Sequence, residues 1–184
     1  MKRPVSTISI LSATVLAAVL QADNSRLLPL LERAPEMFSR HQYWRLVTPL
    51  FMHTRAWEGV CNFVVVAVLG VMVERMFGSK LWLVLFFTSG IVGEIAGHVW
   101  KPVGAGSSVA AAGLLGAIAA WLLFRNRRPQ GVFGALVIVF GAIALTALRD
   151  LHGPPILVGF CIASLAVAAQ SRATVRPQAD ELAP

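Results

Sequence analysis

Six separate apolar segments constrain the fold of this chain more than any other feature. They span about residues 5–22, 57–73, 81–99, 108–124, 132–148 and 154–171. A helix of such a length crosses roughly 30 Å of hydrocarbon. Hydrophobic residues make up 57% of the sequence, charged residues only 14%, and the mean hydropathy is +0.70, which is typical of a membrane protein. We therefore predict an all-α membrane protein whose six helices form one domain over residues 1–172.

The first apolar segment can be interpreted as a signal peptide or as a retained helix, and the C-terminal residues differ in composition from the helices. Lys2 and Arg3 precede the first apolar segment, as in a signal peptide, but the small-residue cleavage pattern around Gln21-Ala22 is poor. We therefore expect a retained first helix. Residues 173–184 are polar and contain proline, which predicts a disordered cytoplasmic tail.

The basic residues predict the orientation. The net charge of +7 suggests nucleic acid as a partner, but most Lys and Arg residues lie at the ends of apolar segments, where they set membrane topology instead. With the N-terminus inside, the outer short loops hold only Lys101 and Arg149. The inner side then holds Lys2, Arg3, Arg75, Lys80, Arg125, Arg127, Arg128, Arg172 and Arg176. Both termini are thus expected in the cytoplasm of a prokaryotic-type inner membrane, with no nucleic-acid partner.

The long first loop, about residues 23–56, is more apolar than an exposed linker. It contains the clusters LLPLL, YW and LFM, is interrupted by three prolines, and carries charges throughout. This pattern favours a segment in the outer interface, with its apolar side in lipid or against the bundle. A small cap outside the membrane is the alternative.

Two serines stand at the start of the fourth apolar segment. In PVGAGSSVAAAGLLGAI (102–118), Ser107 and Ser108 follow a glycine-rich approach and precede a helix without charge until Arg125. Since lipid offers a hydroxyl no easy partner, such a serine is a functional candidate. The simpler interpretation is a helix cap or a packing contact.

Several motifs taken together resemble the rhomboid family of intramembrane serine proteases. WRLVTPLFMH (44–53) is similar to the family's first loop, and VLGVMVERMFGS (68–79) to the end of its second helix. GIVGEIAG (90–97) resembles the glycine-rich third helix, and GSSVAAAGLLGA (106–117) the serine motif. The resemblance covers about residues 43–170 and implies a six-helix bundle with a Ser–His dyad reached from the outer face.

The resemblance also implies roles for individual residues. Ser108 aligns with the nucleophile, His152 is the nearest candidate for the general base, and Asn62 with the Ser108 backbone N–H would form the oxyanion site. A serine hydroxyl needs such a base to become a good nucleophile, and the developing oxyanion needs donors. No metal or cofactor is implied. The residues expected to line the site are His53, Glu58, Gly106, Ser107, Val109 and Ile156.

The sequence departs from the family pattern at three positions. Val109 replaces a glycine after the serine, Glu58 replaces a histidine in the second helix, and Ile156 occupies the usual position of the base. His152 lies one helical turn earlier. Counted from the inner helix ends, it would lie about 4–5 Å shallower than Ser108.

These departures leave more than one function open. The first hypothesis is a protease that cleaves a peptide bond in or near the transmembrane segment of a substrate protein. The second is an inactive pseudoprotease that binds transmembrane helices of client proteins. A small transporter is a third, but inverted repeats and broken helices, which it would need, are not evident.

Overall fold

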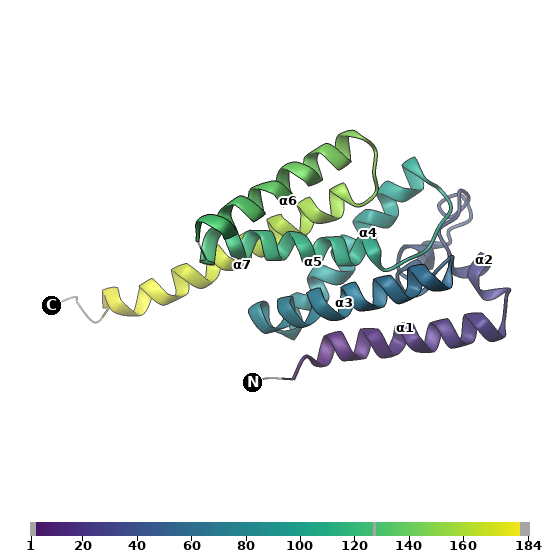
Figure 1. Cartoon of the computed structure of the whole chain (residues 1–184), viewed down its shortest axis with the longest axis horizontal. Helices are drawn as coiled ribbons and strands as arrows, with labels where there is room; N and C mark the ends of the chain where they lie inside the picture. The colour runs from purple at the N-terminus through teal and green to yellow at the C-terminus, as the bar shows by residue number, and fades with distance from the viewer. Residues whose placement is uncertain (1–2, 127, 181–184) are drawn as a thin grey trace.

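The computed structural model describes residues 3–126 and 128–180. Within these ranges the chain forms helices and turns, together with one isolated β-bridge (Figure 1). The elements are α1 (Val5–Asp23), α2 (Leu27–Leu31), the 3₁₀ helices η1 (Tyr43–Leu46) and η2 (Thr48–Phe51), α3 (Ala56–Phe77), α4 (Ser79–Trp100), α5 (Ser108–Trp121), the π-helical segment η3 (Leu122–Asn126), α6 (Pro129–Ala147) and α7 (Gly153–Asp180).

Six of these helices are long and apolar enough to cross a membrane, as predicted. They are α1, α3, α4, α5 with η3, α6, and the Gly153–Ser171 part of α7. The helix α7 continues beyond that part to Asp180, into the segment for which the sequence predicts a disordered tail. The physical reason is that adding a residue to an existing helix costs far less than nucleating one. Residues 181–184 lie outside the described residues.

Helix α5 is the centre of the bundle. Nearly all of its residues are buried, and its neighbours approach it closely because both sides of the contact carry small residues. A Cβ added to Gly116 would lie 2.0 Å from the Ile156 carbonyl oxygen, and one added to Gly159 would lie 2.0 Å from the Gly113 carbonyl oxygen. The backbones of α5 and α7 therefore touch directly, which fixes their register.

Helix α1 is attached to α3 through a buried carboxylate. Glu74, in the last turns of α3, accepts hydrogen bonds from the backbone N–H groups of Ser6 and Thr7, both at 2.8 Å. It also accepts hydrogen bonds from the side-chain hydroxyl groups of Thr7 and Ser79. A carboxylate at a helix N-terminus satisfies N–H groups that have no partner within the helix.

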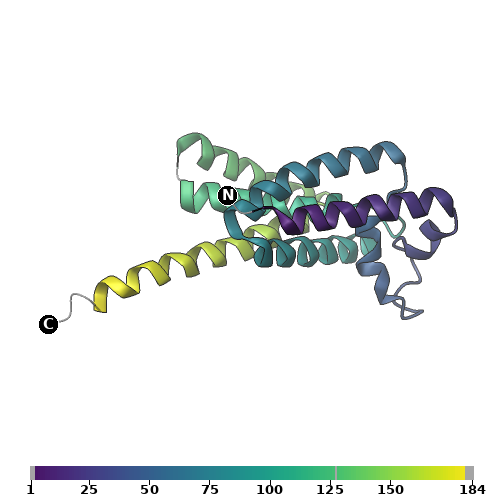
Figure 2. The same ribbon diagram turned by 90° about the horizontal axis from the view of Figure 1, so that it is seen from below.

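The first loop packs on one end of the bundle, away from both termini (Figures 1 and 2). Leu50, which follows Pro49 in η2, is fully buried, and its side chain occupies the space that a Cβ on Gly90 of α4 would need. Leu50 thus packs this loop against α4, whereas Leu30, Tyr43 and Trp44 of its other apolar clusters remain exposed. The candidate site lies at the same end.

Candidate functional site

Ser108 is the first residue of α5, and the segment before it is held by the first loop. The Gly106 N–H donates to the Pro49 carbonyl at 2.9 Å, and the Arg33 N–H donates to the Gly104 carbonyl at 2.9 Å. The Arg33 side chain is buried, donates to the Lys101 carbonyl, and forms a 2.6 Å ion pair with Glu94 of α4. These contacts determine where the Ser108 hydroxyl lies.

His152 lies beside Ser108. Its Nε2 is 3.0 Å from the Ser108 Oγ, a distance at which the two atoms form a hydrogen bond. The residue precedes α7, and its carbonyl accepts the N–H of Ile156, as an N-cap residue does. The helix count from the inner ends therefore placed this imidazole too shallow.

Asp150 is the functional candidate that the sequence analysis missed. Its Oδ1 accepts a hydrogen bond from the backbone N–H of His152 at 2.9 Å and lies 2.7 Å from the ring Nδ1. Lys101 approaches the other carboxylate oxygen at 3.7 Å. Burial raises the pKa of this carboxyl, but the His152 hydrogen bonds and the charges of His152 and Lys101 lower it below its usual value. The available signal was the spacing Asp-x-His within a single turn.

The Ser108 hydroxyl opens into a cavity of about 910 Å³. Asn62 of α3 also lines it: a Cβ on Gly106 would lie 3.3 Å from the Asn62 Nδ2 and 3.7 Å from the Ser108 Oγ. A side chain at Gly106 would therefore fill the space between these two groups. The serine, its imidazole and an amide donor thus face one cavity.

The residues predicted to line the site divide into two groups. Glu58, Gly106 and Val109 line the cavity, whereas His53, Ser107 and Ile156 lie outside it. The Ser107 hydroxyl is buried and faces His53, whose Nε2 is 3.4 Å away. Of the two neighbouring serines, only Ser108 is therefore open to a substrate.

The three departures from the family pattern are accommodated in different ways. Val109 fits because it packs on Gly93 of α4, where a Cβ would lie 2.5 Å from the valine Cβ. Glu58 accepts hydrogen bonds from its neighbours Thr54 and Arg55. Ile156 is buried in a cluster with small residues of α5 and α6, away from Ser108.

The arrangement has the parts that acyl transfer needs. A hydroxyl with a base in hydrogen-bond contact is an activated nucleophile. The carboxylate behind the imidazole favours the tautomer that leaves Nε2 free to accept a proton. Among the described residues, no three His, Cys, Asp or Glu side chains come close enough together to hold a metal ion.

Comparison with known proteins identifies the family. The sequence profile of the rhomboid domain matches residues 40–169, well over half of the chain. Rhomboid-like protease 3 of Toxoplasma gondii is 38% identical over 100 residues, which are 53% of this chain and 38% of that protein. Rhomboid protease GluP of Bacillus subtilis is 33% identical over 110 residues, 59% of this chain and 22% of that protein.

A third relative gives a similar result. The putative rhomboid protease YdcA of Bacillus subtilis is 31% identical over 107 residues, 56% of this chain and 54% of that protein. The matches thus span between about a fifth and a half of these relatives' own lengths. The profile match and the six membrane-spanning helices lead to one conclusion: this chain belongs to the rhomboid family.

Proposed function

We propose that this protein is an intramembrane serine protease that cleaves a peptide bond in or near the transmembrane segment of a substrate protein. The observation that carries the proposal is the 3.0 Å contact between the Ser108 Oγ and the His152 Nε2 at the wall of an open cavity. Ser108 attacks the scissile carbonyl carbon while His152 accepts its proton. His152 then returns this proton to the leaving amine, and a water molecule hydrolyses the acyl-enzyme.

The oxyanion formed in both steps needs hydrogen-bond donors. The Asn62 Nδ2 and the Ser108 backbone N–H are the groups that we assign to it, since Asn62 lines the same cavity as the Ser108 hydroxyl and the N–H belongs to the attacking residue itself. Asp150 is assigned the role of holding the imidazole and stabilising its charged form.

The membrane orientation is part of the proposal. The inner-end arginines and lysines favour cytoplasmic termini. The site lies at the opposite end of the bundle from both termini (Figure 1). It would therefore open to the outer face of a prokaryotic-type inner membrane. Water for hydrolysis would enter from that side.

The decisive experiment compares the two neighbouring serines. A fluorophosphonate probe, which reacts with activated serines, should label the purified wild-type protein and the variant Ser107→Ala, but not Ser108→Ala. Because Ser107 is buried against His53 and lies outside the cavity, it serves as the matched control. Cleavage of a transmembrane reporter substrate should follow the same pattern, and His152→Ala should reduce it by a factor of about 10²–10⁴.

The alternative function, a pseudoprotease that binds transmembrane helices, rests on the substitutions at Glu58, Val109 and Ile156. It predicts a different result. A folded wild-type protein that takes up no probe, cleaves no substrate, and yet retains a transmembrane client peptide would refute the protease and support the binder.

A further inference from the structure

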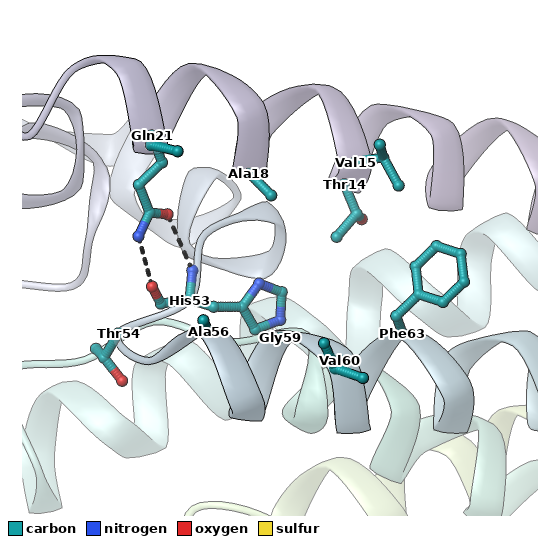
Figure 3. Close-up of a pocket in the computed structure, with 11 residues that line it drawn as sticks. Thr14, Val15, Ala18, Gln21, His53, Thr54, Ala56, Gly59, Val60 and Phe63 are labelled. Carbon is teal, nitrogen blue, oxygen red and sulfur yellow. Dashed lines mark hydrogen bonds between the residues drawn. The ribbon is translucent and has the colours of Figure 1, made fainter.

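A second cavity, of about 570 Å³, lies between α1 and α3 (Figure 3). Its walls come from two helices that span the membrane and from the residues just before α3. Most of the lining side chains are apolar or small: the full set is Thr14, Val15, Ala18, Gln21, Ala22, His53, Thr54, Ala56, Gly59, Val60 and Phe63. Val15 is 50% exposed and Val60 is 66% exposed, so the cavity borders the surface that faces lipid.

One buried polar side chain is directed into this cavity. Figure 3 shows the His53 ring between the two helices, with its backbone held by the Gln21 amide through two hydrogen bonds. The residue is only 6% exposed. Its Nε2 faces the Ser107 Oγ, while its Nδ1 lies beside Gly59, 3.6 Å from where a Cβ would be, and makes no hydrogen bond to any residue that the structure describes.

The free ring nitrogen has a definite chemistry. Burial lowers the pKa of His53, although the charge of Glu58 opposes this, so the imidazole is neutral at neutral pH. A neutral imidazole has one N–H donor and one acceptor nitrogen. If the Ser107 hydroxyl donates to Nε2, the proton of the ring is on Nδ1 and is available to an acceptor in the cavity.

We propose that this cavity binds one acyl chain of a bilayer glycerolipid, with the ester carbonyl of the lipid accepting a hydrogen bond from the His53 Nδ1–H. The apolar walls contact the chain, and the imidazole lies just outside the start of α3, at the depth where ester groups border the hydrocarbon. The volume is within the range of about 300–1,000 Å³ that small ligands occupy.

A transmembrane helix does not fit the same space. A helix about 10 Å wide would fill 570 Å³ within roughly 7 Å of its length, little more than one turn. The proposed lipid site is therefore separate from the site that takes the scissile segment. The two are linked through His53 and Ser107, the residue before Ser108, but lipid binding does not depend on catalysis.

Photocrosslinking tests the proposal on the full chain in detergent. The probe is a phosphatidylglycerol with a diazirine in its acyl chain, and adducts are mapped by mass spectrometry. We expect adducts at cavity residues such as Thr14 and Phe63, competed by unlabelled phosphatidylglycerol. The variant Ala18→Phe, which fills the cavity, should lose at least nine-tenths of them, whereas Leu16→Phe, on the exposed face of the same helix and outside the cavity, should retain them.

Two further variants separate the contribution of the His53 hydrogen bond to lipid binding from any effect of the proposed catalytic serine. His53→Phe keeps the ring volume without the donor and should lower adduct yield several-fold, while Ser108→Ala should bind like wild type even if the proposed protease function is wrong. Equal yields in Ala18→Phe and Leu16→Phe would overturn the proposal. So would adducts spread evenly over lipid-facing positions such as Phe140 of α6, or competition by a transmembrane peptide but not by the lipid.

Discussion

A single added methyl group at Gly116 should separate the catalytic pair without touching it. In Gly116→Ala, the new Cβ would lie 2.0 Å from the Ile156 carbonyl oxygen, whereas ordinary contact begins at 3.4 Å. The new Cβ is bonded directly to the α5 backbone and the Ile156 oxygen belongs to the α7 backbone, so no side-chain rotation can relieve the contact. The helices α5 and α7 must therefore separate locally by about 1.4 Å, the difference between the two distances.

The displacement has two consequences of different size. Forcing a methyl group into a packed contact costs about 1–3 kcal/mol, partly offset by the better helix propensity of alanine, about 1 kcal/mol. Ile156 lies one turn from His152, so a similar shift at the imidazole would lengthen its 3.0 Å contact with Ser108 beyond hydrogen-bond distance. Since misplacing a catalytic group by about 1 Å costs about 10²-fold, activity should fall by roughly two orders of magnitude.

The assay compares Gly116→Ala with Gly141→Ala. Gly141 also lies within a helix, α6, but a Cβ there meets nothing within 4 Å, so that variant should keep full activity and equal or slightly higher stability. Thermal unfolding in detergent and the rate of probe labelling at Ser108 are measured for both. If Gly116→Ala unfolds and reacts like Gly141→Ala, the argument from the α5–α7 contact is refuted.

Three further predictions follow from other contacts. Asp150→Asn should lower substrate cleavage by about 10- to 100-fold with little change in stability, because an amide no longer favours the required tautomer or balances the charged imidazole of His152; an unchanged rate would remove Asp150 from the mechanism. Glu74→Ala should destabilise the fold by about 2–4 kcal/mol in thermal unfolding, because the N–H groups at the start of α1 lose their buried acceptor, and Glu74→Gln should cost less. Adding Ile156→His to His152→Ala should not restore activity, since residue 156 packs away from Ser108; recovery would show that the base can act from the family's usual position.

Some features of the fold and site follow directly from the residues. A membrane-spanning helix is recognised by its length and apolar composition alone, so the six spans were predictable. Ser108 was distinguishable from Ser107 through the spacing to the glycines of α5. His152 was named as the candidate base for Ser108 from the family resemblance, whereas the contact between His53 and Ser107 was not predicted, because the two residues lie far apart in the sequence.

Other features depend on contacts that no local pattern encodes. An aspartate in a short loop before a helix usually serves as a turn or cap residue, so the Asp-x-His spacing did not by itself mark Asp150 as functional before its distance to His152 was known. Val109 was noted only as a departure from the family pattern, since the sequence does not reveal that Gly93 of α4 faces it. A substitution that breaks a family pattern can thus be compensated by a small residue on a neighbouring helix.

The depth of His152 shows which reference point such an argument needs. Counting from the inner helix ends fails because α7 continues to Asp180, which leaves its inner boundary undefined. The α5–α7 contact is a better origin: Gly113 and Gly116 of α5 meet Ile156 and Gly159 of α7. From the middle of that contact, Ser108 lies about 10 Å toward the outer end and His152 about 8 Å, whereas residue 156 lies only about 2 Å away. A base at position 156 would lie too deep in the membrane to reach Ser108. The N-cap position of α7, which His152 occupies, lies at nearly the same depth as this serine.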